Sequence, residues 1–289
     1  MSASAGRSAV YGEHNLYDLG QVPMDDLRAS GFTTVILWKL NIDKQGDLYY
    51  CKGRYGKDRK LVSDGAYVGD PEWPSHLATL KKQQPTSVTR LELSIGEAGG
   101  DDWSIIKDSI GRHGTGPSSV LYRNFQALRK ATGADAINND DEECYDADST
   151  VTFAKMTQVI GYTGFTLAPY TNVAHWRGVK DGLGAFVDRV YLQAYSGGAS
   201  NDPQQWTRDL GMPVDPGLWS VHDENGGNCN RGDDPTAVKD KMSAWNTPRG
   251  SVPGGFMFLY EDMMECSKAG KLSDYARVIN EATGGAVAP

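Results

Sequence analysis

The feature that most constrains the fold is an alternation of short apolar runs, rich in β-forming residues, with helical or loop segments. The alternation predicts βα units around a parallel sheet, and eight such units predict a single closed (β/α)8 barrel, a TIM barrel, over residues 1–289. Its active site would lie at the carboxyl ends of the strands. The expected strands cover residues 8–11, 33–40, 88–95, 134–145, 163–168, 186–195, 216–221 and 255–260.

One long insertion interrupts this alternation. Residues 41–75 follow the second strand, are rich in Gly, Tyr and Lys, and are expected to contain a hairpin around 47–51. An excursion of this length between core elements is often functional. Residues 283–289 are expected to be frayed. Helices are expected at 23–30, 76–83, 118–132, 149–160 and 273–282, with a small helix after residue 100.

The charge balance argues against two classes of partner. A net charge of −8 and a pI near 5.2 do not attract nucleic acids or anionic membranes. No apolar run approaches the roughly 20 residues of a membrane span. The first residues lack the apolar core of a signal peptide, so a leader is expected to be absent or already removed.

Residues 134–145, Ala-Asp-Ala-Ile-Asn-Asn-Asp-Asp-Glu-Glu-Cys-Tyr, begin apolar and become strongly acidic. In a strand, alternate side chains share a face, so Asn138, Asp140 and Glu142 would project together at its end. Two carboxyl groups held that closely do not titrate alike: the better hydrogen-bonded one stays ionised, and the other is pushed toward its protonated form. Cleavage of a glycosidic bond needs such a pair of an acid and a charge stabiliser.

The acidic run has alternatives to this catalytic role. Acidic clusters are most often solvated loops. An EF-hand counted from Asp135 would put Asp140 where the turn needs glycine and Asp146 where a bidentate glutamate belongs, so a calcium loop is excluded. A barrel enzyme with a metal on Asp140 and Glu142 is a third possibility. The sequence does not show the histidine clustering that transition metals favour, so no metal is expected.

The stretch 135–142, Asp-Ala-Ile-Asn-Asn-Asp-Asp-Glu, resembles the fourth-strand signature of glycoside hydrolase family 18, Asp-Gly-x-Asp-x-Asp-x-Glu. Its ending, residues 140–142, is most similar to that of the single-domain endo-β-N-acetylglucosaminidases of the family. Three weaker likenesses follow the family's order: Ser-Ile-Gly at 94–96, Ala-Pro at 168–169 and Gln-Ala-Tyr at 193–195. Together they span nearly the whole barrel.

The resemblance implies a retaining glycosidase that cleaves β-1,4 linkages of N-acetylglucosamine (GlcNAc), in chitin or in the chitobiose core of N-glycans, without a cofactor. Glu142 would protonate the glycosidic oxygen, and the substrate's own acetamido oxygen would attack the anomeric carbon. Asp140 would hold the acetamido N–H, and the Tyr195 hydroxyl would bond to the acetamido oxygen. The expected partner is a GlcNAc-containing oligosaccharide, and the protein is expected to be a monomer.

Departures from the family pattern support a second hypothesis, a carbohydrate-binding relative with little or no turnover. Asn138 replaces the middle aspartate, which should leave Asp140 more firmly ionised. Leu259 stands where the family places the tryptophan beneath the sugar, a stacking surface that Tyr260 or Trp219 would have to supply. Further departures stand at Ala136, Glu97 and Ser196.

The residues expected to bind the substrate combine strand-end positions with aromatic side chains near the predicted rim. For Tyr11 and Tyr170, core packing is an equally good interpretation, and for Trp38, in mid-strand, it is the better one. The set is Asn138, Gln193, Tyr170, Tyr11, Trp219 and Tyr260.

Four cysteines follow the second, fourth, seventh and eighth strands, on the rim that would carry the site. Cys229 and Cys266 fall in adjacent loops and are expected to pair, and Cys51 is expected to pair with Cys144. The alternative is four buried free thiols. No pair has the spacing of a zinc site. We expect an extracellular protein.

Overall fold

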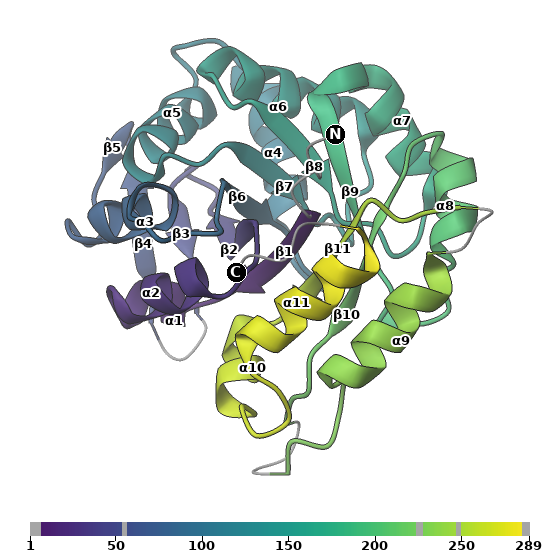
Figure 1. The fold of residues 1–289 in the computed structure, drawn as a ribbon. Helices are drawn as coiled ribbons and strands as arrows, with labels where there is room; N and C mark the ends of the chain where they lie inside the picture. The colour runs from purple at the N-terminus through teal and green to yellow at the C-terminus, as the bar shows by residue number, and fades with distance from the viewer. Residues whose placement is uncertain (1–6, 54–56, 224–227, 247–249, 285–289) are drawn as a thin grey trace. The chain divides into compact units, whose positions relative to one another are not determined.

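The computed structural model describes residues 7–53, 57–223, 228–246 and 250–284. Eleven strands form one sheet in the order β1-β11-β10-β9-β8-β7-β6-β2-β3-β4-β5, and β1 also pairs with β2. Eight of these strands close into a (β/α)8 barrel with helices between them, as Figure 1 shows. The predicted fold class is therefore confirmed.

The barrel strands lie close to the runs that the sequence predicts. They are β1 (Arg7–Gly12), β2 (Thr34–Ile42), β6 (Arg90–Ile95), β7 (Ala136–Asn139), β8 (Gly164–Leu167), β9 (Val187–Gln193), β10 (Asp215–Trp219) and β11 (Gly254–Phe258). The insertion carries β3 (Leu48–Tyr50), β4 (Arg59–Ser63) and β5 (Ala66–Tyr67).

The helices include all those predicted and several more. The α-helices are α1 (Asn15–Asp18), α2 (Val22–Ala29), α3 (Trp73–Lys82), α4 (Asp102–His113), α5 (Val120–Thr132), α6 (Ala147–Ile160), α7 (Val173–Leu183), α8 (Pro203–Leu210), α9 (Pro235–Trp245), α10 (Tyr260–Glu265) and α11 (Leu272–Ala282). The described residues also include the short 3-10 helices η2 (Gly184–Phe186) and η3 (Ser196–Gly198).

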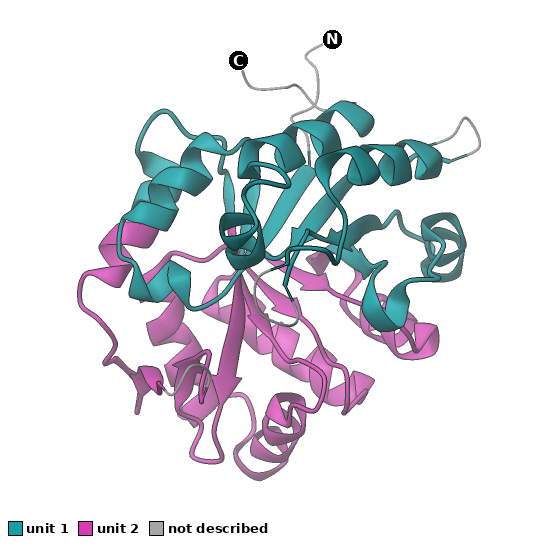
Figure 2. Cartoon of the chain, turned by 90° about the horizontal axis from the view of Figure 1, so that it is seen from below, with its two compact units in different colours: residues 1–36, 79–90, 189–289 teal, residues 37–78, 91–188 magenta. Residues whose placement is uncertain are grey.

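The chain divides into two compact units, shown in Figure 2. The first unit comprises residues 1–36, 79–90 and 189–289, and the second comprises residues 37–78 and 91–188.

An aromatic core fills the first unit, in which β1, β11, β10 and β9 pair in parallel. Gly217 lies opposite Phe256, and a Cβ added there would lie 2.0 Å from the Phe256 ring. Glycine at this position therefore leaves the space that the ring occupies. Tyr11 and Tyr191 pack against the same ring, at centroid distances of 5.3 and 5.6 Å.

Strand register in the second unit sets up the acidic strand end. Strands β6, β7 and β8 pair in parallel, so Ser94, Asn138 and Thr166 lie side by side. The preceding helix, α5, ends at Gly133, whose φ of 65° is the left-handed conformation that glycine adopts readily at a helix end. This turn directs the chain into β7.

The insertion after β2 is an ordered antiparallel extension of the sheet. Strand β3 pairs with β2 and with β4, and β4 pairs with β5. The hairpin predicted around 47–51 is confirmed as β3, whereas β4 and β5 were not predicted. Asn124 of α5 fastens the extension, because it donates to the Gly46 carbonyl and accepts from the Gly65 N–H, each at 2.6 Å.

Two elements differ in length from their predictions. The fourth strand, expected over 134–145, ends at Asn139, and the helix after residue 100 is α4, which is 12 residues long rather than small. Most of the predicted frayed tail, residues 285–289, lies outside the described residues. Within the described ranges, none of the helices has the length and apolar character needed to cross a membrane.

Candidate active site

A buried chain of hydrogen bonds fixes Asn138 on β7. The Ser94 hydroxyl donates to Asn138 Oδ1 at 2.7 Å, and Asn138 Nδ2 donates to Thr166 Oγ1 at 2.9 Å. Thr166 in turn donates to the Glu92 carboxylate at 2.6 Å. All four side chains are buried, so the polar groups satisfy one another inside the unit. Asn138 is thus oriented by both neighbouring strands.

Asp140 lies one residue beyond the end of β7 and is only 6% exposed. Its backbone N–H donates to the Ile95 carbonyl at 2.9 Å, and the Trp38 indole N–H donates to its Oδ2 at 3.2 Å. Burial and the nearby charge of Glu142 raise the pKa of Asp140 well above its ordinary value, against the opposing effects of Trp38 and Lys39.

The expectation that Asn138 leaves Asp140 more firmly ionised stays a prediction. Desolvation of the Asp140 carboxyl is the largest cause of its raised pKa, and the charge of Glu142 is the next. Because the charge of Glu142 acts on Asp140, protonation of one carboxyl affects the other.

Glu142 lies on the bend that follows β7 and is partly buried. Asp141, next to it, organises this bend: its carboxylate accepts the backbone N–H groups of residues 143–145 at 3.1, 2.8 and 2.7 Å. The carboxylate of Asp141 therefore holds the loop, as asparagine and aspartate commonly do in turns. The acidic run is neither a simple strand nor a freely solvated loop.

Aromatic side chains line the continuation of this loop. Tyr145 contacts His175 and Trp176 edge-on, at centroid distances of 5.3 and 6.3 Å. Burial and the neighbouring Tyr170 hydroxyl raise the pKa of Tyr145. Tyr170 is partly exposed in this neighbourhood, and its predicted role in substrate binding stays a prediction. Sequence analysis did not single out Tyr145 or His175.

In the first unit, three partly exposed rings gather at the ends of β9, β10 and β11. The Tyr195 ring stacks on Phe258 at 5.7 Å with an interplanar angle of 17°, and its centroid lies 6.1 Å from that of Trp219. A cavity of about 360 Å³ opens beside Tyr195 and Trp219, with His222 and Arg231 in its lining. Phe258 belongs to this group although sequence analysis did not identify it.

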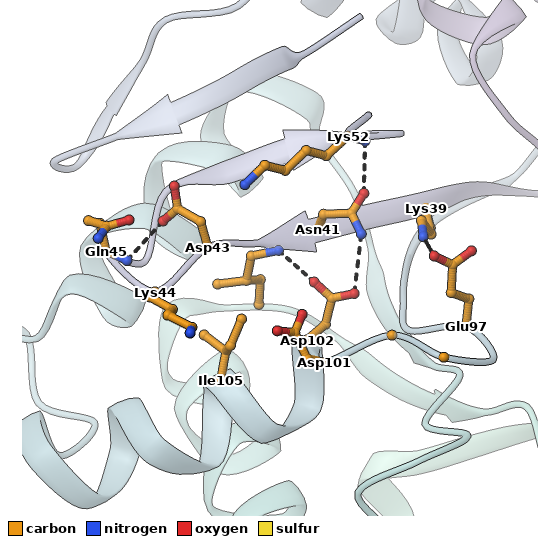
Figure 3. A pocket seen from close by; sticks show the side chains of 13 residues that line it. Lys39, Asn41, Asp43, Lys44, Gln45, Lys52, Glu97, Asp101, Asp102 and Ile105 are labelled. Atoms are coloured by element: carbon orange, nitrogen blue, oxygen red, sulfur yellow. Dashed lines mark hydrogen bonds and ion pairs between the residues drawn. The ribbon is translucent and has the colours of Figure 1, made fainter. Parts of the chain in front are cut away.

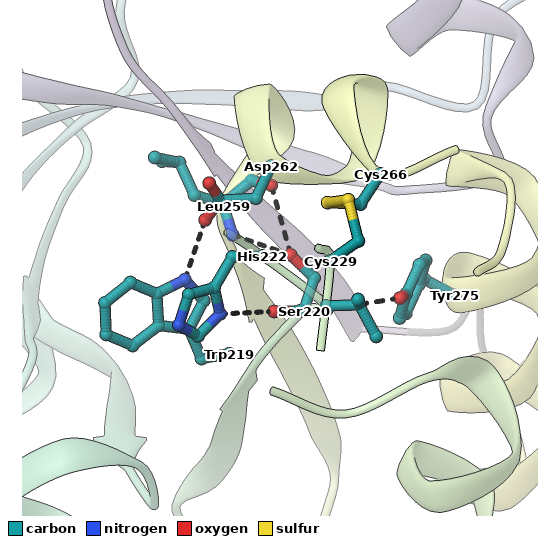
Figure 4. The surroundings of a disulfide bond; sticks show 9 residues. Trp219, Ser220, His222, Cys229, Leu259, Asp262, Cys266 and Tyr275 are labelled. Atoms are coloured by element: carbon teal, nitrogen blue, oxygen red, sulfur yellow. Dashed lines mark hydrogen bonds between the residues drawn. A yellow bond between two sulfur atoms is a disulfide. The ribbon is translucent and has the colours of Figure 1, made fainter. Parts of the chain in front are cut away.

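Figure 4 shows how Trp219 is held. Its indole N–H donates to Asp262 Oδ2 at 2.7 Å, and its ring stacks on the His222 imidazole with centroids 4.0 Å apart. The Cys229–Cys266 disulfide lies beside these residues, with an S–S distance of 2.04 Å, and confirms the predicted pairing. Cys266 directly follows α10, the helix that carries Asp262, so the bond ties the end of that helix to the loop after β10.

The second predicted disulfide is wrong. Cys51 and Cys144 are free thiols. Cys51 is buried at the end of the β3 strand, where its Sγ–H donates to the Trp38 carbonyl at 3.5 Å, while Cys144 belongs to the loop that Asp141 organises. The side chain of Cys51 therefore points into the sheet rather than toward the rim.

Two predicted sugar platforms are also corrected. Tyr11 and Tyr260 are each 2% exposed, so neither ring has a face open to a ligand. Tyr11 packs in the aromatic core of the first unit, and the Tyr260 hydroxyl donates to Asp26 of α2 at 3.1 Å. Gln193 ends β9 and is 8% exposed, and its role in binding stays a prediction.

The predicted catalytic residues belong to different units. Asp140 and Glu142 lie in the second unit and Tyr195 in the first. The approach of the Tyr195 hydroxyl to the two carboxyl groups therefore stays a prediction. No group of histidine, cysteine, aspartate and glutamate side chains suited to a metal ion is found among the residues that the structure describes.

Comparisons with known proteins give matches only at the level of structure. No family profile and no curated protein sequence matches this chain. A fungal endo-β-N-acetylglucosaminidase of glycosyl hydrolase family 18 superposes with a TM-score of 0.63 and 13% identity, covering 96% of this chain and 99% of that one. The fold is similar to that of solved structures from glycoside hydrolase family 18. The family resemblance seen in the sequence is thereby confirmed for the fold.

Two chitinases show the same likeness. The putative Chitinase A of Streptomyces coelicolor has a TM-score of 0.60 and 11% identity, with 96% of this chain and 98% of that chain covered. Chitinase ChiA74 of Bacillus thuringiensis has a TM-score of 0.64 and 12% identity, with 99% and 71% covered. At these identities the comparison shows the fold alone.

Proposed function

We propose that the protein is a retaining glycoside hydrolase that cleaves β-1,4 linkages of N-acetylglucosamine, in chitin oligosaccharides or in the chitobiose core of N-glycans. The observation that carries this proposal is the interacting pair Asp140 and Glu142 at the end of β7. Two carboxyl groups, one buried and one partly exposed, share the strand end of a family 18 fold.

One shared proton gives the pair its two roles. The charge of Glu142 is a cause of the raised pKa of Asp140, so protonation of Glu142 removes that repulsion and favours the Asp140 carboxylate. Glu142 is then the general acid and Asp140 the charge stabiliser. Partial exposure of Glu142 suits a group that must reach the substrate, whereas the buried Asp140 is held by Trp38.

The proposed reaction proceeds in two steps. The acetamido oxygen of the substrate attacks the anomeric carbon while Glu142 gives its proton to the departing glycosidic oxygen, which leaves a cyclic oxazolinium ion. Asp140 accepts the acetamido N–H and stabilises the positive charge. In the second step Glu142 takes a proton from water, and the water oxygen attacks the anomeric carbon and opens the ring. Two displacements retain the configuration.

The aromatic group of the first unit supplies the proposed contacts to the sugar. We assign the hydroxyl of Tyr195 to the acetamido oxygen and the ring of Trp219 to stacking against a pyranose face. Trp219 suits this role because Asp262 and His222 fix its indole while it stays partly exposed. Residues 1–289 would act as one catalytic domain, as a monomer and outside the cell.

A carbohydrate-binding protein without turnover is the second candidate. It is favoured by Asn138, whose amide is committed to Ser94 and Thr166, and by Leu259, which is buried and offers no stacking surface. Binding tolerates such changes more readily than a transition state does.

Hydrolysis assays with Glu142→Gln separate the two candidates. Wild-type protein, Glu142→Gln and the control Glu143→Gln are incubated with chitooligosaccharides and a high-mannose glycopeptide, and the products are separated by chromatography. Glu143 is adjacent to Glu142, so its replacement makes the same chemical change beside the site. We expect cleavage by the wild type and the control, and a loss of at least about a hundredfold in Glu142→Gln. Binding without cleavage by any of the three proteins would reject the enzyme.

A further inference from the structure

A second cavity lies in the second unit and contains none of the proposed catalytic residues. It has a volume of about 490 Å³ and is enclosed by the end of β2, the turn into β3, the loop after β6 and the start of α4 (Figure 3). A pocket of this size accommodates a small ligand. The lining includes Lys39, Asn41, Asp43, Lys44, Gln45, Lys52, Glu97, Asp101, Asp102 and Ile105.

Hydrogen bonds connect the residues at the floor of this cavity. Asp102 is 3% exposed and accepts the Ile42 backbone N–H at 2.7 Å and the Asn41 amide N–H at 3.2 Å. The Asn41 side-chain oxygen accepts the Lys52 backbone N–H at 2.9 Å. These bonds, visible in Figure 3, join the start of α4 to β2 and to the end of the β3 hairpin. A preformed polar floor lowers the cost of ordering a ligand.

Charges of both signs line the cavity, and most of the carboxylates are already engaged. The buried Lys39 ammonium forms an ion pair with Glu97. Asp43 accepts the Tyr49 hydroxyl at 3.0 Å as well as two backbone N–H groups of its own turn. Three lysines therefore face four carboxylates, so the cavity has little net charge and offers both donors and acceptors.

The mouth of the cavity is formed by exposed polar side chains, Lys44, Gln45, Lys52 and Asp101. Lys52 extends over the Tyr49 ring at 4.3 Å, which keeps its stem at the rim. No aromatic residue is among the lining residues that the structure describes. The cavity thus suits a ligand that is recognised by hydrogen bonds rather than by ring stacking.

Two features connect the cavity to the segment that carries the acidic pair. Gly99 in its wall donates its N–H to Glu143 at 2.7 Å, one residue after Glu142. On β2, Lys39 of the cavity follows Trp38, whose indole holds Asp140. The cavity and the acidic strand end therefore share their supporting elements within one unit.

We propose that this cavity is a binding site for one uncharged, hydroxyl-rich sugar unit of the substrate, separate from the unit whose bond is cleaved. The inference rests on the proposed function, and it adds that the insertion after β2 selects substrates by size. Sugar hydroxyls both donate and accept, which matches a lining of ammonium, amide and carboxylate groups with little net charge. Such a unit reaches the cavity only in a substrate with enough sugar residues.

The test uses two double variants with the same change of charge. Lys52→Ala/Asp101→Ala removes two exposed side chains from the mouth. The control Lys82→Ala/Asp108→Ala removes two exposed side chains that do not line the cavity. Each is made in the Glu142→Gln background, and binding of chitobiose, chitotetraose, chitohexaose and the high-mannose glycopeptide is measured by calorimetry. The same double variants with Glu142 intact are assayed for kcat/KM on the same ligands.

We expect the mouth variant to bind at least one of the longer ligands about tenfold more weakly, because it loses a hydrogen bond to a charged group. Its binding of chitobiose should be unchanged. The control variant should bind every ligand as the parent does. The proposed site would be overturned if the affinity of the mouth variant changed by less than about twofold for all ligands, or if it fell equally at every ligand length. It would also be overturned if the parent bound none of the ligands. If the mouth variant loses binding but the wild type cleaves nothing, the site stands and the proposed hydrolase fails.

Discussion

The hydrogen bond from Trp38 to Asp140 gives a prediction whose size follows from the structure. Phenylalanine at position 38 keeps an aromatic ring but lacks the indole N–H that donates to Asp140 Oδ2 at 3.2 Å. A hydrogen bond to a charged group contributes about 1.5–3 kcal/mol. Because one pKa unit corresponds to about 1.36 kcal/mol, Trp38→Phe should raise the pKa of Asp140 by about 1–2 units.

The sign of the effect on activity follows from the role of Asp140. In the proposed mechanism Asp140 must be ionised while Glu142 is protonated, so the acidic limb of the pH dependence of kcat/KM reports ionisation of the pair. A further rise in the pKa of Asp140 means that its carboxylate is lost at a higher pH. Trp38→Phe should therefore move the acidic limb upward by about 1–2 pH units.

A matched control is available in the same unit. The Trp103 indole also donates a buried hydrogen bond, but to the Ile95 carbonyl at 2.9 Å. Trp103→Phe makes the same chemical change and should lower stability without moving the acidic limb. The assay is kcat/KM on a chitooligosaccharide between about pH 3 and 9, with Tm measured at each pH. An unmoved limb in Trp38→Phe, or equal movement in both variants, would refute the reasoning.

Three further predictions concern other parts of the chain. Burial raises the pKa of Glu261 to about 8. Between about pH 5 and 8 the folded state therefore keeps a proton that the unfolded state has released, so the free energy of unfolding should fall as the pH rises. Glu261→Gln should flatten this pH dependence, measured by urea titrations. Trp219→Ala should raise KM about tenfold with little loss of kcat, and Trp219→Phe should recover part of the affinity. Denatured, unreduced protein should present two reactive thiols. Cys229→Ser/Cys266→Ser should lower the free energy of unfolding by about 4 kcal/mol, because the disulfide closes a loop of 37 residues in the unfolded chain.

Local sequence patterns predicted the barrel because strands buried on both faces are continuous apolar runs. The run 33–40 became β2, and the amphipathic helix 118–132 became α5 with Gly133 at its end. The fourth strand was predicted too long because alternation alone does not show where pairing stops. Asp141 ends it by taking three backbone N–H groups that an extended strand would leave free.

Long-range contacts decide the details that the sequence could not supply. Trp38 was interpreted as a core residue, yet its partner Asp140 is 102 positions away. Tyr11 and Tyr260 were placed at the rim by their position at strand ends, but packing against distant elements buries both. The pairing of Cys51 with Cys144 failed for the same reason, since the side chain of Cys51 turns toward the Trp38 carbonyl.

The stereochemistry of the first product tests the central claim most directly. Proton NMR recorded within minutes of adding the wild-type protein to a chitooligosaccharide distinguishes the anomers before they equilibrate. Because the proposed mechanism displaces twice at the anomeric carbon, we expect the β-anomer to form first and the α-anomer to follow by mutarotation. If the α-anomer forms first, water attacks directly, and the roles assigned to Asp140 and Glu142 are contradicted.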